Sequence, residues 1–246
     1  MKRRAHVHAE FVGLPAAGKT RLASEVKRQL ADRRNASSAT GSLTVTTSSE
    51  VREHRSFGSV PATAFREVAS SPRRAFRSFA DIHRTRQPSL RHVLEYHSYL
   101  QYVCGEIRRQ RAESDVHLAD QGYLQHLWRI HLTARRDGID GLLALTERLY
   151  PTIQPDVVVF VEVDTETRME RGALRGDDPD EAFFDPNHPA IVQDRSAYRD
   201  VKALVRSISD GPGREVRTVR VHNTEAALAQ NTAEITDQLL AVERQR

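Results

Sequence analysis

The sequence predicts an α/β fold in which a five-stranded parallel sheet is sandwiched by helices. Two observations support this fold class. Five short stretches of strand-like residues alternate with longer stretches of helical periodicity along the 246-residue chain, an order typical of parallel sheets with right-handed crossover connections. A complete match to the phosphate-binding pattern G-x-x-x-x-G-K-[ST] follows the first strand-like stretch, at residues 13–20.

The glycine-rich segment has the flanking structure that its pattern requires. Apolar residues alternate over 7–12, which predicts a strand, and they recur at helical spacing after the segment to about residue 33. Because strand, glycine loop and helix occur in this order, we expect a P-loop NTPase fold. The alternative is a surface turn that matches the pattern by chance.

Each part of the loop has a chemical reason. Gly13 and Gly18 lack a Cβ, so the backbone can turn tightly and present its N–H groups to the phosphates of a nucleotide. Lys19 is expected to reach the β- and γ-phosphates, and the Thr20 hydroxyl to bind magnesium. The predicted ATP-binding residues of the loop are Gly13, Leu14, Pro15, Ala16, Ala17, Gly18, Lys19 and Thr20.

The remaining elements follow from periodicity and turn residues. A β-branched stretch at 43–47 predicts the second strand, and residues 48–61 show no regular pattern. Further strands are expected at 116–119, 157–163 and 216–221, and helices at 61–86 (broken near Pro72), 89–111, 122–135, 139–149, from 165, 189–208 and 226–242. Residues 1–246 are expected to form one domain, with a helical lid at about 165–188 and an acceptor-side helical region at about 48–112.

Polar residues follow the predicted strands. Gly13, Glu50, Asp120, Asp164 and Asn223 lie at or just past the five strand ends. In an open parallel sheet the carboxyl ends of the strands form one edge, where ligands bind, so we expect these residues on one rim. Asp120 is the expected magnesium ligand or the group that positions the acceptor hydroxyl. An ordinary helix N-cap is the alternative.

Three arginines share one face of the helix predicted from residue 165. Arg168, Arg171 and Arg175 are spaced by three and four residues. Their mutual repulsion is relieved when an anion lies among them, and phosphoryl transfer builds charge on the transferred group. A solvated face paired with neighbouring acidic residues is the alternative, but the upstream P-loop favours a role in catalysis.

The layout resembles the thymidylate kinase and deoxynucleoside kinase branch of the P-loop nucleotide kinases. The matching segments are EFVGLPAAGKT at 10–20, LADQG at 118–122 and PDVVVFVEVD at 155–164. The resemblance implies a mobile lid whose Arg171 and Arg175 contact ATP, and a substrate-contacting acidic residue after the second strand, Glu50. It also implies acceptor contacts on the helix before the third strand, which carries Tyr99 and Gln101.

Two departures from the family pattern fall on the acceptor side. Gln121 stands where these kinases usually carry an arginine beside the acidic residue, and Ser-Ser-Glu-Val at 48–51 stands where Glu-Pro is common. The acceptor is therefore left open between a nucleotide, a nucleoside and another hydroxyl-bearing metabolite. Arg77, from the arginine-rich segment at 61–86, is a further expected substrate contact.

These observations together predict an ATP-dependent phosphotransferase with ATP and Mg²⁺ as its cofactors. The expected catalytic residues are Lys19, Asp120, Arg171 and Arg175, and Arg168 and Asn223 complete the expected ATP site. Two alternatives remain: a regulatory P-loop ATPase, which would hydrolyse nucleotide without an acceptor, and a polynucleotide kinase that uses the arginines and phenylalanines of 61–86. The guanine-binding motif Asn/Thr-Lys-x-Asp does not occur in the chain.

Composition limits the partners. Lys and Arg total 37 against 33 Asp and Glu, a modest surplus for nucleic-acid binding, so we expect a nucleotide and a small-molecule acceptor instead. No apolar run approaches the roughly 20 residues of a membrane helix. A single cysteine excludes an intrachain disulfide and favours a cytoplasmic location. No histidine cluster has zinc-like spacing, so we expect no zinc site. A homodimer is one assembly open to the chain, and the sequence does not identify the oligomeric state.

Overall fold

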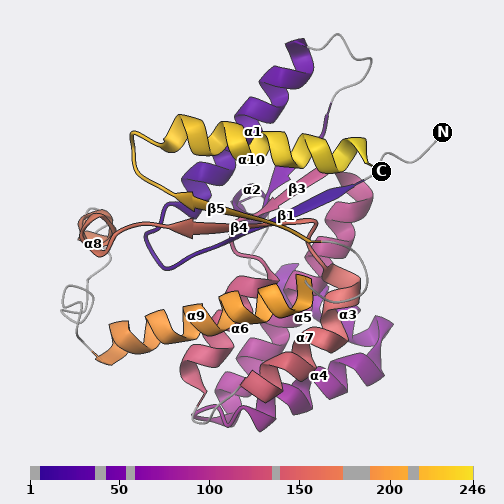
Figure 1. The fold of residues 1–246 in the computed structure, drawn as a ribbon. Coiled ribbons are helices and arrows are strands. Elements are labelled where there is room, and N and C mark those ends of the chain that lie inside the picture. Colours follow the sequence, from indigo (N-terminus) through magenta and orange to yellow (C-terminus); the bar gives the residue numbers. More distant parts are fainter. Residues whose placement is uncertain are drawn as a thin grey trace.

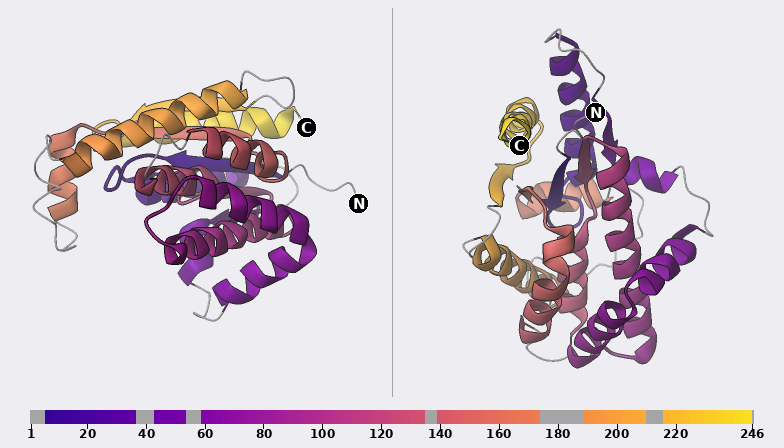
Figure 2. Two further views of the ribbon diagram at one scale, coloured as in Figure 1. Left: turned by 90° about the horizontal axis from the view of Figure 1, so that it is seen from below. Right: turned by 90° about the vertical axis from the view of Figure 1, so that its right-hand side faces the viewer.

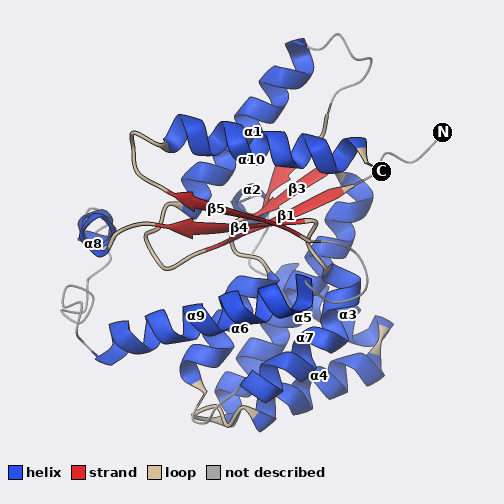
Figure 3. Ribbon diagram, viewed as in Figure 1, coloured by secondary structure: helices blue, strands red, loops and turns tan. Residues whose placement is uncertain are grey.

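A sheet of five parallel strands organises the chain (Figures 1 and 3). The computed structural model describes residues 6–36, 43–53, 59–134, 139–173, 189–209 and 216–245. The strands are β1 (Val7–Val12), β2 (Val45–Thr47), β3 (Val116–Ala119), β4 (Val157–Glu162) and β5 (Arg217–His222). Their order in the sheet is β2-β3-β1-β4-β5, with every pair parallel. The predicted α/β fold class is confirmed.

Helices cover both faces of this sheet. Within the described ranges they are α1 (Lys19–Ala36), α2 (Ser48–Glu53), α3 (Ser59–Ser70), α4 (Pro72–Arg84), α5 (Leu90–Glu113), α6 (Tyr123–Thr133), α7 (Ile139–Ile153), α8 (Thr165–Ala173), α9 (Pro189–Ser209) and α10 (Leu228–Arg244). Figure 1 shows α1 and α10 together on one face and α5, α6, α7 and α9 on the other, and Figure 2 gives two further views of these layers. None of these helices, within the described residues, is long and apolar enough to cross a membrane.

The central strand β1 is buried along its whole length. Side chains alternate between the faces of a strand, so Val7, Ala9 and Phe11 pack in the layer formed with α1 and α10. His8 and Glu10 consequently face the other layer, toward α5 and α6, although both are polar. This alternation places a carboxyl group and an imidazole inside the protein, directly under the helices that surround the candidate site.

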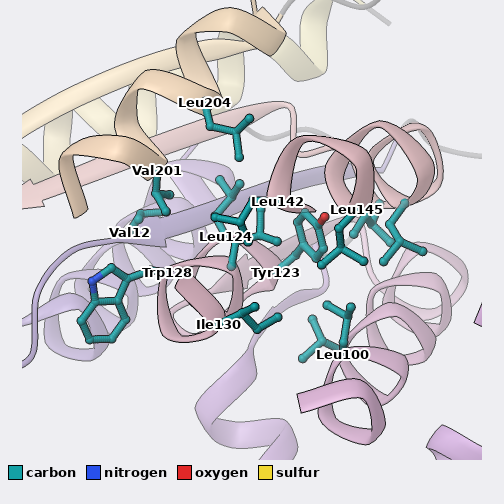
Figure 4. Packing of buried hydrophobic residues seen from close by; sticks show 14 of the residues in the cluster. Val12, Leu100, Tyr123, Leu124, Trp128, Ile130, Leu142, Leu145, Val201 and Leu204 are labelled. Carbon is teal, nitrogen blue, oxygen red and sulfur yellow. The ribbon is translucent and has the colours of Figure 1, made fainter. Parts of the chain in front are cut away.

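The larger apolar core lies between the sheet and the α5, α6, α7 and α9 layer (Figure 4). Tyr123 and Leu124, at the start of α6, are fully buried there beside Leu100 of α5, Leu142 of α7 and Val201 of α9. Helix α6 is therefore packed on several sides. A helix held in this way can present its remaining face as a fixed wall.

Residues 48–53 differ from the sequence expectation because they form the helix α2. Thr47 and Glu50 make a reciprocal capping box: the Glu50 carboxylate accepts from the Thr47 N–H at 3.2 Å, and the Thr47 hydroxyl accepts from the Glu50 N–H at 3.3 Å. Glu50 also pairs with Lys27 of α1 at 2.5 Å. The T-x-x-E spacing is visible in the sequence, and it is the signal that predicts this short helix.

Candidate active site

The glycine-rich segment forms the loop between β1 and α1. Ala16 has φ 61° and Gly18 has φ 84°, and successive N–H groups in such left-handed turns converge into an anion-binding concavity. A Cβ on Gly18 would lie 2.5 Å from Asn223 Nδ2, and a Cβ on Gly13 would lie 2.5 Å from the Val161 carbonyl oxygen. Both glycines are thus needed where the loop approaches the ends of β4 and β5.

Lys19 folds back over this loop. Its Nζ donates hydrogen bonds to the carbonyl oxygens of Gly13 at 2.6 Å and Leu14 at 3.0 Å. The side chain is partly exposed and lines the cavity beside the loop. The ammonium group is therefore held at the mouth of the concavity, where the outer phosphates of a bound nucleotide would lie.

Thr20 and Asp120 meet at the carboxyl edge of the sheet. The Thr20 hydroxyl donates a 2.6 Å hydrogen bond to Asp120 Oδ2, and Asp120 is fully buried. Two adjacent oxygen donors of this kind suit Mg²⁺, which usually takes one or two protein ligands and completes its shell with phosphates and water. The residues present therefore fit the magnesium ion that the sequence predicts.

Arg171 and Asn223 lie behind the loop. Asn223 Nδ2 donates to the Ala17 carbonyl at 2.7 Å, and Arg171 Nη2 donates to the Asn223 carbonyl at 2.9 Å. A cavity of about 210 Å³ opens beside them, lined by Gly18, Arg21, Arg171, Asn223, Thr224, Glu225 and Leu228. Helix α8, through Arg171, and the loop after β5, through Asn223, thus contact the glycine-rich loop directly.

A larger cavity of about 460 Å³ lies on the other side of the loop. Its lining residues are Pro15, Ala16, Gly18, Lys19, Thr20, Tyr96, Gln121, Gln125, His126, Trp128, Arg129, Leu132 and Thr133. Aromatic rings, two amides and one guanidinium group therefore line a half-open cavity together with Lys19 and Thr20. Such a mixture of flat apolar surface and a few polar groups is typical of small-molecule sites.

Helical rotation separates the predicted acceptor residues of α5. Tyr99 packs against His126 of α6 with tilted rings whose centroids are 4.1 Å apart, and it lines a small recess that shares Gln121 with the larger cavity. Gln101 is buried and donates from Nε2 to Ser78 Oγ of α4 at 3.0 Å. Residues two positions apart in an α-helix, such as Tyr99 and Gln101, point about 200° apart around the axis. Gln101 therefore ties α5 to α4, so its predicted acceptor contact is corrected to a packing contact.

The other predicted residues lie in different places. Arg77 is exposed on α4, outside the linings of the cavities described here. Glu50 is engaged by its capping box and by Lys27, and its contact with substrate stays a prediction. Arg168 is buried on α8, and Arg175 lies outside the described residues.

The cavity wall supplied by α6 was not among the predicted site residues. Gln125, Trp128, Arg129 and Thr133 of α6 line the cavity together with Gln121 of the preceding turn. The α6 residues are spaced by three, one and four positions, which is the spacing of one helix face. The signal was present in the sequence as polar and aromatic residues along one stripe after Asp120. Apolar periodicity alone does not reveal it, because Trp128 also belongs to the core.

Comparisons with known proteins add little beyond the arrangement of the chain. No family model and no curated protein sequence matches. Among solved structures, deoxyadenosine kinase from M. mycoides with bound dCTP is similar over 94% of this chain and 100% of its own, at 10% sequence identity and a TM-score of 0.46. The site itself, rather than this likeness, supports the function proposed below.

Proposed function

We propose that this protein is an ATP-dependent kinase that transfers the γ-phosphate to a hydroxyl group of a small molecule. One observation carries the proposal: the glycine-rich loop, with Lys19 and the Thr20–Asp120 pair, borders a half-open cavity of about 460 Å³ whose opposite wall is α6. A protein that only hydrolyses ATP needs room for a water molecule beyond the γ-phosphate. A cavity of this size provides room for a second substrate.

On the side of the site that would bind ATP, the phosphates and the nucleoside part would be held by different groups. Loop N–H groups and the N-terminus of α1 hold the phosphates, and Lys19 neutralises the outer ones. Arg171, held against Asn223, lies on the side of the smaller cavity, where the nucleoside part of ATP would fit. These groups are placed before substrate arrives, so little reorganisation is needed as charge develops.

Thr20 and Asp120 would hold the magnesium ion that accompanies ATP, and that ion supplies charge neutralisation on the phosphates. The acceptor would lie against Tyr96, His126 and Trp128, with its hydroxyl directed toward Lys19. An acceptor bound against the fixed α6 wall displaces water, which would otherwise consume ATP. The class of acceptor is left as a hydroxyl-bearing metabolite, a nucleoside or a nucleotide.

Acceptor-dependent ADP formation tests this function. The full chain is supplied with Mg·ATP and panels of nucleosides, nucleotides and other hydroxylated metabolites, and ADP release is measured with and without each compound. A kinase releases ADP at least about 100-fold faster with its acceptor, because bound substrates react as if unimolecularly. ADP release that is equally fast without any acceptor would support the regulatory ATPase instead.

The lysine pair on α1 supplies a matched control. Lys19→Ala should abolish ADP formation, whereas Lys27→Ala, two turns further along the same helix and paired with Glu50, should retain it. Equal activity of both variants would contradict the proposal. A cytoplasmic location and a homodimer remain part of it as predictions, the second of which size-exclusion chromatography tests.

A further inference from the structure

Glu10 is a buried carboxylate at the centre of the sheet that the proposed chemistry does not use. It lies on β1, three residues before the glycine loop, and is fully buried. Its Oε1 accepts from the Tyr123 N–H at 3.1 Å and its Oε2 accepts from the Leu124 N–H at 2.8 Å. Both donors belong to the first turn of α6, so Glu10 caps that helix from a strand 113 residues away in sequence.

Helix α6 needs this external cap. Its N-cap residue is Gly122, which has no side chain to accept the free N–H groups of the first turn. A carboxylate at a helix N-terminus is also favoured by the helix dipole. Glu10 therefore provides two acceptor oxygens that the local sequence of α6 lacks.

The packing between Glu10 and the turn before α6 is close. A Cβ on Gly122 would lie 2.5 Å from the carboxyl carbon of Glu10. His8 Nε2 also lies 3.3 Å from Glu10 Oε1. The carboxylate is consequently confined by the first turn of α6, by Gly122 and by His8, and it packs directly against the Asp120-Gln121-Gly122 turn.

That turn carries the groups on which the proposed reaction depends. Asp120 accepts from Thr20, and α6 then supplies the cavity wall with Gln125 and Arg129. One buried side chain thus links the strand that leads into the phosphate loop with the turn that holds the magnesium ligand.

We infer that Glu10 is a positioning residue: by holding the start of α6, it fixes the position in which Asp120 binds magnesium. The inference rests on the proposed function, because it concerns the metal that accompanies ATP. It assigns Glu10 no contact with substrate. Its effect passes through the two N–H groups and the turn.

Magnesium-dependent nucleotide affinity provides a test that needs no acceptor. Binding of a non-hydrolysable ATP analogue is measured by calorimetry with EDTA and with Mg²⁺ for the wild type and Glu10→Gln. The amide keeps the size of the side chain but can accept only one of the two N–H groups. We expect magnesium-free affinity within about threefold of wild type, and a loss of about tenfold or more in the gain that Mg²⁺ confers, as for other residues that orient metal ligands.

Asp156 supplies the matched control. It is a buried carboxylate that accepts from the His8 N–H at 2.8 Å. Asp156 directly precedes β4, at the amino ends of the strands, whereas Asp120 follows β3 at the carboxyl ends. Asp156→Asn should retain the magnesium gain even if it lowers the thermal midpoint. A second test variant, Gly122→Ala, keeps Glu10 but places a methyl group against its carboxyl carbon, and should lose the gain as well.

The outcomes separate this inference from the proposed function. A wild-type protein that does not bind the analogue would contradict the proposed function and the inference together. A wild-type protein that binds it with a magnesium gain, with folded Glu10→Gln and Gly122→Ala variants that keep the full gain, would overturn the inference alone. Equal loss in Asp156→Asn would also overturn it, because the effect would then be general destabilisation.

Discussion

The Thr20 hydroxyl donates a 2.6 Å hydrogen bond to Asp120 across 100 residues of sequence. The contact exists because β1 and β3 are neighbours in the sheet, paired from Val7 with Val116 to Glu10 with Ala119. The glycine loop and the Asp120 turn, which follow the carboxyl ends of these two strands, therefore lie side by side. This adjacency joins a phosphate-binding loop to a metal-binding carboxylate.

Loss of the Asp120 carboxylate should affect catalysis far more than nucleotide binding. We expect Asp120→Asn to lower kcat about 100-fold or more, the range seen when a group that stabilises transition-state charge is removed. Binding of ATP in EDTA should change little, because the loop N–H groups and Lys19 remain. Steady-state kinetics and calorimetry measure the two effects, and an equal loss in both would contradict the assignment.

Arg171 should contribute chiefly to the donor side. Its guanidinium contacts the Asn223 carbonyl and lines the smaller cavity, so Arg171→Ala is expected to raise the KM for ATP about tenfold, the equivalent of one charge-assisted hydrogen bond. The KM for the acceptor should stay within about twofold. Arg199→Ala, an exposed arginine of α9, is the control and should leave both unchanged.

Arg129 should contribute to the acceptor side. It is exposed to solvent at the wall of the larger cavity, so its removal costs little folding stability. Arg129→Ala is expected to raise the KM for the acceptor by about tenfold for a substrate that carries an anionic or acceptor group there, with the KM for ATP unchanged. Arg91→Ala, exposed at the start of α5, should match wild type.

Gln101 should contribute to stability and leave the kinetic parameters alone. Its amide is buried against Ser78, and truncation leaves a buried hydroxyl with one partner fewer. Gln101→Ala is expected to lower the free energy of unfolding by about 1–3 kcal/mol in urea denaturation, while both KM values remain those of wild type. A raised acceptor KM would restore the original prediction that Gln101 binds substrate.

Stability should depend on pH through Glu10. Burial raises the pKa of its carboxyl from 4.5 to about 7, so the folded protein binds more protons than the unfolded chain between these values. The contribution of Glu10 to the free energy of unfolding is therefore complete below about pH 4.5 and is lost as the pH rises through 7.

The variant Glu10→Gln isolates this contribution, because it does not titrate and shares His8, His117 and Arg111 with the wild type. Relative to Glu10→Gln, the wild type should lose about 3 kcal/mol of unfolding free energy between pH 5 and pH 8, measured by urea denaturation at each pH. A difference that is constant over this range would show that Glu10 titrates at its ordinary pKa.

Local patterns predicted the elements well. The strand at 157–162 was visible as an apolar run, and the strand–loop–helix order around residues 13–20 predicted the glycine loop. The short α2 helix was missed because its capping box, Thr47 with Glu50, is a side-chain signal rather than an apolar period. The substrate contact assigned to Glu50 stays a prediction.

The sequence by itself determined the fold class, the glycine loop and the residues at the strand ends, because these depend on spacing along the chain and on the parallel order of the strands. Only the tertiary structure decided which face of α5 meets the cavity, that α6 forms its wall, and that Glu10 caps α6. Those relationships depend on helix rotation and on contacts between residues 100 or more positions apart, such as Glu10 with Leu124 and Thr20 with Asp120. No local pattern encodes them, since each partner is also compatible with an ordinary structural role.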